Sequence, residues 1–259
     1  MSDRGPLDVV PLWLLFLVTI MFVLLTIEVG FRIGRRRARG TDPEKESPVG
    51  AMVGASLGLL AFLLAFTFGF AASRFEARRT VLIEEVNAIG TAYLRTSMIP
   101  EPARGDARRL FREYVDVRLH APRSGQSDAA IRRSLEIQGE LWRGAAALGE
   151  ASPQSIVLGL YVQSLNEVID LHTKRVTEAL RVRVPAVIWL VLYSVTALAM
   201  AELGYQTGLS GRRRPLSIPA LALAFAAVML LIADLDRPQA GMVRVSQQAM
   251  SELRQSMAE

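Results

Sequence analysis

Two carboxylates interrupt apolar sequence that is otherwise long enough to cross a membrane. Glu28 lies in the run 9–31, and Glu202 lies in the run 186–208. Ionisable groups inside such runs commonly mark ion or substrate pathways, so these intramembrane carboxylates are the first candidates for chemistry. The competing interpretation is structural, because both lie near the end of their run, where water or a neighbouring arginine such as Arg32 can compensate the charge.

An acidic pair closes the run 215–233, where the sequence continues as DLDRPQAG. Asp234 and Asp236 follow the C-terminal end of a predicted helix, whose carbonyl groups disfavour nearby carboxylates, and we expect Arg237 to compensate them. Together with polar residues after the run 49–72, the pair predicts an ion-coordinating or gating collar made of Arg78, Glu84, Glu85, Asp234, Asp236 and Arg237. The alternative is a solvated helix face held by arginine–glutamate pairs.

Composition excludes several other kinds of chemistry. The chain has no cysteine and only two histidines, so disulfides and thiolate metal sites are excluded and a zinc site is not expected. It contains neither a phosphate-binding Gly-Lys-Ser/Thr loop nor a metalloprotease or serine-hydrolase motif. We therefore predict no catalytic residues, no cofactor and no metal. The arginine excess flanks apolar runs, which indicates membrane lipids rather than nucleic acid as partners.

Four apolar segments are long enough to cross a hydrocarbon core of about 30 Å: 9–31, 49–72, 186–208 and 215–233. The first is too long for a signal peptide, and its basic cluster follows it. The residues between the second and third segments are charged and show helical spacing without two-residue alternation. The sequence thus predicts an all-α membrane protein with four transmembrane helices and an antiparallel helical-bundle insert between spans two and three.

The helix of span two is expected to continue to residue 95, followed by helices over 104–120, 127–148 and 153–183. His172 falls on the apolar stripe of the last helix, which favours a packed core histidine over a ligand. A return helix with apolar residues from Met242 to Met257 is expected on the membrane or against the insert. The predicted domains are a membrane hairpin at 1–73, an insert at 74–184, a second hairpin at 185–234 and an amphipathic tail at 235–259.

Basic residues concentrate in the short loops 32–48 and 209–214. The positive-inside rule places these loops in the cytoplasm and both termini and the insert outside.

Small residues repeat every four positions in span two. Gly50, Gly54 and Gly58 form the repeat, and such spacing lets two helix backbones approach closely. One interpretation is tight packing within the chain. The other is a subunit contact or a pore-lining face, with a hydrophobic gate downstream. The candidate pore and gate residues are Gly54, Gly58, Phe66, Thr67 and Phe70.

The chain resembles the bacterial bestrophin-like membrane family in two segments, LLAFLLAFTFGFAASRFEARRTVLIEEVNAIGTAYLR (59–95) and DLDRPQAGMVRVSQQAM (234–250). The resemblance extends over nearly the whole chain. The resemblance implies a multi-pass protein of the bacterial inner membrane. Bestrophins are pentameric anion channels with four-span subunits and cytoplasmic termini, opposite to the orientation predicted above.

Two functions are compatible with these observations. The first is a homo-oligomeric ion channel or transport-related protein with span two at its axis and an inorganic ion as its partner. The second is a membrane-anchored sensor or scaffold whose helical insert binds another protein. No enzymatic function is expected.

Overall fold

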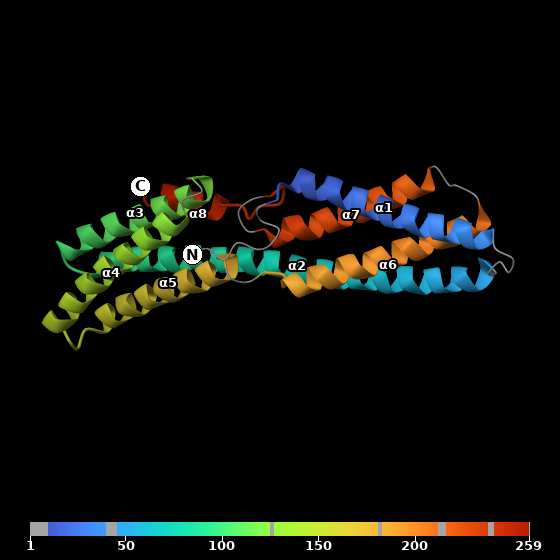
Figure 1. Ribbon diagram of the computed structural model, residues 1–259. Coiled ribbons are helices and arrows are strands. Elements are labelled where there is room, and N and C mark those ends of the chain that lie inside the picture. Colours follow the sequence, from blue (N-terminus) through green and yellow to red (C-terminus); the bar gives the residue numbers. More distant parts are fainter. Residues whose placement is uncertain are drawn as a thin grey trace. The chain divides into compact units, whose positions relative to one another are not determined.

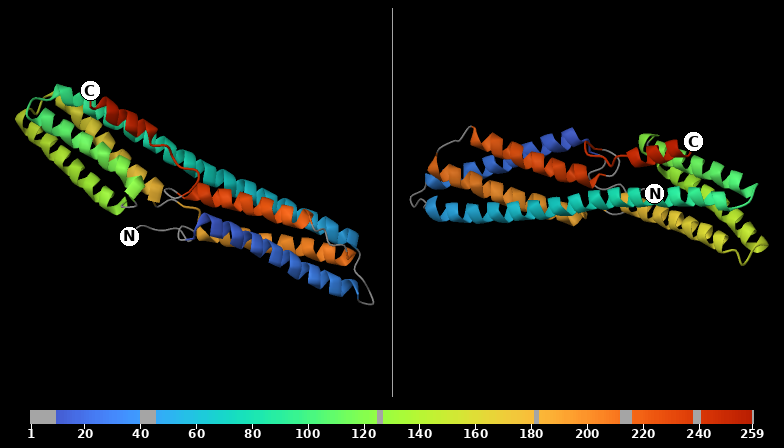
Figure 2. Two further views of the ribbon diagram at one scale, coloured as in Figure 1. Left: turned by 90° about the horizontal axis from the view of Figure 1, so that it is seen from above. Right: turned by 180° about the vertical axis from the view of Figure 1, so that it is seen from behind.

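The computed structural model describes residues 10–39, 46–124, 127–180, 183–211, 216–237 and 241–258. These residues form helices and no strand, which confirms the all-α prediction. The chain divides into two compact units (Figures 1 and 2). The membrane unit comprises Arg4–Arg74 and Arg183–Val243, and the insert unit comprises Phe75–Val182 and Arg244–Glu259.

The membrane unit contains α1 (Leu12–Ala38), the first part of α2 (Glu46–Arg95), α6 (Ala186–Ser210) and α7 (Ser217–Asp236). These four helices are long and apolar enough to span a membrane, as predicted. Helix α1 packs along both α6 and α7. Large apolar side chains remain exposed on the unit, among them Phe62 at 66% and Leu190 at 68%. Such exposure suits helices whose outer faces meet lipid rather than water.

Two helix boundaries in the membrane unit have identifiable causes. Helix α1 continues past its apolar run to Ala38, because the arginines that follow are good helix formers and favour the negative C-terminal end. Helix α6 ends at Gly211, which adopts the left-handed conformation with φ of 68°.

Helix α2 is a single helix from Glu46 to Arg95, as the sequence predicts. Its last part belongs to the insert unit, where a short 3-10 helix, η1 (Thr96–Met98), follows it. The hydroxyl of Thr96 donates to the carbonyl oxygen of Tyr93 at 2.7 Å, which satisfies one carbonyl of the terminal turn.

The insert unit packs the last part of α2 with α3 (Ala103–Ser124), α4 (Ser127–Ala151) and α5 (Ile156–Leu180). Neighbouring helices run antiparallel and join through short connections (Figure 2). Their apolar stripes meet in one core, in which Phe111, Ile137 and Leu165 are fully buried. This is how amphipathic helices bury their apolar surface in a bundle.

The fourth insert helix begins later than the sequence predicts. The expected start is Pro153, but α5 starts at Ile156. The hydroxyl oxygen of Ser155 accepts the backbone N–H of Leu158 at 3.2 Å. Ser155 therefore acts as the N-cap, a role that serine fills better than proline.

The return helix is shorter than predicted. Helix α8 spans Gln248–Ser256, and Met242 lies outside it with 70% of its surface exposed. Met250 and Met257 are buried in the insert core, and Leu253 packs against it. The tail thus lies against the insert, which is one of the two placements that the sequence allows.

Candidate functional site

The closest helix packing in the membrane unit joins α1 and α6. Gly30 and Gly34 on α1 face Gly204 and Gly208 on α6, and a Cβ atom added at any of the four would overlap the partner helix backbone. Thr19 and Tyr193 add a hydrogen bond across the same pair of helices, with 2.9 Å between their oxygens. We call this contact the α1–α6 seam. In lipid, where apolar side chains gain little by meeting each other, backbone proximity stabilises helix pairs.

The glycine repeat of span two is packed within the chain at its first member alone, since a Cβ atom at Gly50 would overlap the side-chain amide of Gln206 on α6. A Cβ at Gly54, Gly58 or Gly69 would have no heavy atom within 4 Å. These glycines share an exposed face of α2 with Phe62 and Phe66, which are 66% and 68% exposed. We call this surface the α2 open face. The prediction of tight packing within the chain is wrong for Gly54 and Gly58, and a contact with another copy stays a prediction.

The structure separates the predicted gate residues. Thr67 is 4% exposed and its hydroxyl donates to the carbonyl of Leu63 at 2.7 Å, so it faces the interior of the membrane unit. Phe70 is half-buried under the Arg74 guanidinium, whose carbon lies 4.9 Å from the ring centroid. Of the gate residues, only Phe66 shares the α2 open face with Gly54 and Gly58. Thr67 therefore does not fit a role beside them in a pore wall.

The two intramembrane carboxylates have different surroundings. Glu28 accepts a hydrogen bond from Nε of Arg32 at 2.8 Å, one turn further along α1. This pair matches the structural interpretation of Glu28. The Oε2 atom of Glu202 is buried and has no hydrogen-bond partner among the described residues. A buried, unsatisfied carboxylate oxygen requires an explanation, so Glu202 remains the stronger functional candidate of the two.

Asp234 organises the turn that follows α7. It is fully buried, and its two carboxylate oxygens accept the backbone N–H groups of Met242 and Val243 at 2.8 and 2.9 Å. Backbone amides thus compensate this carboxylate, a role that the sequence analysis assigns to Arg237. A Cβ at Gly241 would overlap Oδ1 of Asp234, so a larger residue there would displace this carboxylate.

The neighbouring charged residues of this turn bind backbone groups. Asp236 accepts the N–H of Val184 at 2.9 Å, and its carbonyl oxygen accepts Nη1 of Arg183 at 2.7 Å. Arg237 donates to the carbonyl oxygen of Val10. These contacts connect the end of α7 to the start of α6 and to the segment before α1. Asp234, Asp236 and Arg237 therefore form a polar junction between helix ends.

The residues of the predicted collar on α2 also diverge. Arg78 is buried, whereas Glu84 is exposed and pairs with Lys174 of α5 at 2.9 Å. Glu85 is fully buried within the insert core. A carboxylate in that position cannot coordinate ions at a membrane surface, so the inclusion of Glu85 in the collar is wrong. The other members stay predictions.

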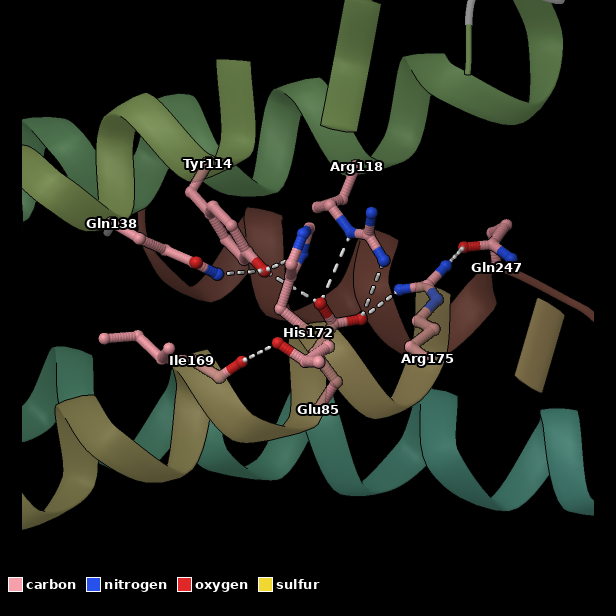
Figure 3. A network of polar contacts seen from close by, with 9 residues as sticks. Glu85, Tyr114, Arg118, Gln138, Ile169, His172, Arg175 and Gln247 are labelled. Carbon is pink, nitrogen blue, oxygen red and sulfur yellow. Dashed lines mark hydrogen bonds and ion pairs between the residues drawn. The ribbon is translucent and has the colours of Figure 1, made fainter. Parts of the chain in front are cut away.

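Glu85 is the centre of a buried polar cluster in the insert unit (Figure 3). Arg118 of α3 approaches it with Nε 3.3 Å from Oε1, and Arg175 of α5 donates to Oε2. The hydroxyl of Tyr114 donates to Oε1 at 2.9 Å. Arg175 also donates to Oε1 of Gln247 at 3.2 Å, which ties the tail to the same cluster. One carboxylate thus holds three helices and the tail together.

The hydrogen-bond pattern assigns the state of His172. Because Tyr114 gives its proton to Glu85, its oxygen accepts from Gln138 Nε2 at 3.4 Å and from His172 Nδ1 at 3.0 Å. The histidine therefore carries its proton on Nδ1. Burial, followed by the nearby positive charge of Arg118, lowers the pKa of His172 to about 4. His172 is a neutral, buried core histidine, as the apolar stripe favours.

The sequence reasoning missed Tyr114, Arg118 and Gln138. A signal was present: Arg118 lies on the buried stripe of α3 formed by Phe111, Tyr114 and Val115, and Glu85 lies between Leu82 and Val86 on α2. A carboxylate and arginines at buried positions of neighbouring helices indicate mutual pairing, since an unpaired buried charge is costly.

The arrangement is suited to structural and transport roles. Among the described residues, no group of three or more histidines and carboxylates is placed to hold a metal ion. The Glu85 cluster is enclosed by packed helices, so it serves to fix the insert rather than to contact a substrate. The surfaces left for function are the α2 open face, the carboxylate of Glu202 and the exposed parts of the insert.

The fold matches that of solved bacterial membrane proteins. A bestrophin homologue from Klebsiella pneumoniae bearing one substitution superposes with a TM-score of 0.65 at 15% identity, over 94% of this chain and 96% of that one. A second variant of the homologue from that organism matches at 14% identity with a TM-score of 0.65, over 96% and 99% of the chains. A third matches at 17% identity with a TM-score of 0.64, over 94% and 96%. No curated protein matches significantly.

The family comparison rests on the sequence itself. The family model of the bestrophin-like domain matches residues 17–250, which run from within α1 to the first turn of α8. The match spans both units, including the Glu85 cluster and the Asp234 turn. The chain is a membrane protein and belongs to the bestrophin-like family.

Proposed function

We propose that the chain is a subunit of a homo-oligomeric ion channel in which the α2 open face meets other copies and borders the conduction path. Membership of the bestrophin-like family supports ion transport, because bestrophins are channels. A single membrane unit of four helices is small for enclosing a path, so several copies are required.

The observation that carries the proposal is the contrast between two glycine rows. The glycines of the α1–α6 seam pack against the partner helix inside the chain, whereas a Cβ atom at Gly54, Gly58 or Gly69 would have no heavy atom within 4 Å. Small residues are frequent where membrane helices approach each other. A row of them on an exposed helix face is therefore available for a neighbouring subunit, and the exposed rings of Phe62 and Phe66 supply the hydrophobic constriction.

The polar residues of the membrane unit take separate roles in this proposal. Glu202 is proposed to influence permeating cations or protons, and its buried Oε2, which lacks a hydrogen-bond partner among the described residues, supports this role. Asp234, Asp236 and Arg237 hold the junction of helix ends. The short basic loops are proposed to face the cytoplasm of a bacterial inner membrane, which a reporter fused to the C-terminus would test.

The direct test is ion flux from liposomes that contain the purified full-length chain, under separate potassium and chloride gradients. We expect selective flux that changes when Phe66→Ala widens the constriction. The matched control is Leu190→Ala, which truncates an exposed apolar side chain on another helix, α6. Phe62 is unsuitable as a control, because it shares the α2 open face with Phe66. No flux from correctly folded wild-type protein would argue against the channel. Equal flux from all three proteins would argue against Phe66 as its constriction.

A scaffold function has one observation in its favour. Large apolar side chains are exposed on the insert where η1 meets the start of α5: Leu94 at 71%, Met98 at 54% and Ile156 at 82%. Nη1 of Arg95 donates to the carbonyl of Leu160 at 2.6 Å and connects these segments. Retention of another membrane or soluble protein by the full-length chain, lost on Ile156→Ser, would favour this function.

A further inference from the structure

The outward face of α1 changes abruptly from apolar to basic along its length. The side of α1 that contains Gly30 and Gly34 packs on α6, and the opposite side is exposed. That exposed side carries Val18, Met21, Leu25 and Val29, each 47–66% exposed. At the same 100° helical spacing it continues with Arg32, Arg36 and Arg39, with Arg35 beside them. The exposed face therefore has an apolar stripe followed by a ladder of guanidinium groups.

The dimensions of the stripe suit one membrane leaflet. Val18 and Val29 are separated by about 16 Å along a helix that rises 1.5 Å per residue. Half of a hydrocarbon core of about 30 Å is roughly 15 Å. Trp13, which is 65% exposed near the start of α1, lies where an interfacial tryptophan is expected on the opposite side. The guanidinium ladder therefore begins at the depth of phosphate headgroups.

The ladder carries an excess of positive charge at this depth. Residues 28–39 contain five arginines and one carboxylate, Glu28, which accepts a hydrogen bond from Arg32. Arg35, Arg36 and Arg39 are exposed, and within the described part of the chain no carboxylate pairs with them. Guanidinium groups bind phosphate oxygens in pairs and with favourable geometry. Topology alone requires positive charge in the loop, but it does not require that charge to continue the register of an apolar stripe.

We propose that this face of α1 is a binding site for an anionic glycerophospholipid. Its phosphate is held by Arg36 and Arg39, with Arg32 and Arg35 alongside. Its acyl chain lies along Val29, Leu25, Met21 and Val18. The apolar stripe identifies a lipid rather than free phosphate as the ligand, because only a lipid has an acyl chain that can contact these apolar side chains. The excess of guanidinium groups over carboxylates identifies an anionic headgroup rather than a zwitterionic one.

The test is native mass spectrometry of the full-length chain in detergent, titrated with dioleoyl phosphatidylglycerol or dioleoyl phosphatidylcholine. We expect wild-type protein to bind phosphatidylglycerol preferentially. The double variant Arg36→Gln/Arg39→Gln should weaken that binding roughly thirtyfold, the effect of two guanidiniums at an anionic lipid, and leave phosphatidylcholine binding unchanged.

A charge-matched control separates a site from general attraction. Arg37 is exposed on another side of α1, and Arg143 is exposed on α4. The variant Arg37→Gln/Arg143→Gln loses the same charge and should bind phosphatidylglycerol like wild type. Equal weakening in both double variants, no preference between the two lipids, or complete displacement by inorganic phosphate would each overturn the proposal. Because bound mass is the readout, the result does not depend on whether the protein conducts ions.

Discussion

The two units of the molecule bury polar and small groups in opposite ways. The insert unit encloses a cluster of charged side chains, with Glu85 between Arg118 and Arg175. The membrane unit relies on the α1–α6 seam, where glycines bring two backbones together. In water, burial of apolar side chains drives bundle formation and can offset the desolvation of a few paired charges. In lipid that drive is absent, so close backbone contact takes its place.

The largest effect should come from removing the carboxylate of the insert cluster. Glu85→Ala leaves two buried guanidiniums without a counter-charge, and we expect a loss of about 3–5 kcal/mol of stability. The adjacent exposed pair of Glu84 and Lys174 provides the control, and Glu84→Ala should cost less than about 1 kcal/mol. Thermal unfolding of the full-length chain in detergent measures both. Similar melting of the two variants would contradict the buried-cluster account.

The glycine rows should respond with opposite signs to the same substitution. Gly204→Ala places a Cβ against the backbone of α1 near Ile27, and we expect a loss of about 1–3 kcal/mol from overpacking. Gly58→Ala meets no atom in the chain and should stabilise α2 itself by about 0.5–1 kcal/mol. The same unfolding assay, performed at low protein concentration, compares them. Destabilisation by both would remove the distinction between the seam and the α2 open face.

These glycines show where sequence reasoning reaches its limit. The four spans, the continuous α2 and the helical insert follow from apolar length and spacing, and the structure confirms them. Gly30 and Gly34 have the same four-residue spacing as Gly54 and Gly58, yet only the first pair is packed within the chain. Spacing reports that a close approach is feasible. It does not identify the partner helix.

The collar prediction failed at Glu85 for a related reason. Glu84 and Glu85 are neighbours in sequence, but about 100° of helix rotation places one on the surface and the other in the core. The role of Asp234 was hidden differently, because its partners are backbone amides eight and nine residues later. Backbone N–H groups are present in nearly every residue, so the residue type at these positions does not reveal the contact. Gly241, where a Cβ would overlap that carboxylate, is the residue whose type is consistent with the contact.

The insert unit should lose stability in acid. His172 is neutral when folded, and its pKa of about 4 lies below the ordinary value of 6.5 because of burial and the positive charges of Arg118 and Arg175. Glu85 acts in the opposite direction, and Tyr114 is a neutral neighbour. At a pH between about 4 and 6.5, this histidine binds a proton in the unfolded chain but not in the folded chain. Stability should therefore fall by about 1 kcal/mol per pH unit as pH decreases from about 6 to 4.5.

The acid response can be assigned by substitution. His172→Gln removes the titrating group, so its unfolding temperature should vary less between pH 6 and 4.5 than that of wild type. Gly204→Ala in the seam retains His172 and should keep the wild-type pH dependence. An unchanged pH dependence in His172→Gln would show that another group titrates.

The smallest effect is expected where the tail meets the insert surface. Arg254 donates to both carboxylate oxygens of Asp116, at 2.6 and 3.1 Å, but the side chains are 32% and 41% exposed. Asp116→Asn should cost less than about 1 kcal/mol, because exposed pairs are screened by solvent. The tail should remain docked through Met250 and Met257. Loss of tail protection in hydrogen exchange of this variant would mean that the ion pair, rather than the methionines, holds it.

The central claim is that the α2 open face joins copies of the chain, and the mass of the assembled particle tests it most directly. We would measure that mass by light scattering in detergent for wild type, for Gly58→Leu and for Ala227→Leu, an exposed position on α7. The account predicts an oligomer for wild type and Ala227→Leu, and a shift toward the 28.4 kDa single chain for Gly58→Leu with its thermal unfolding preserved. An unchanged oligomer in Gly58→Leu would contradict it.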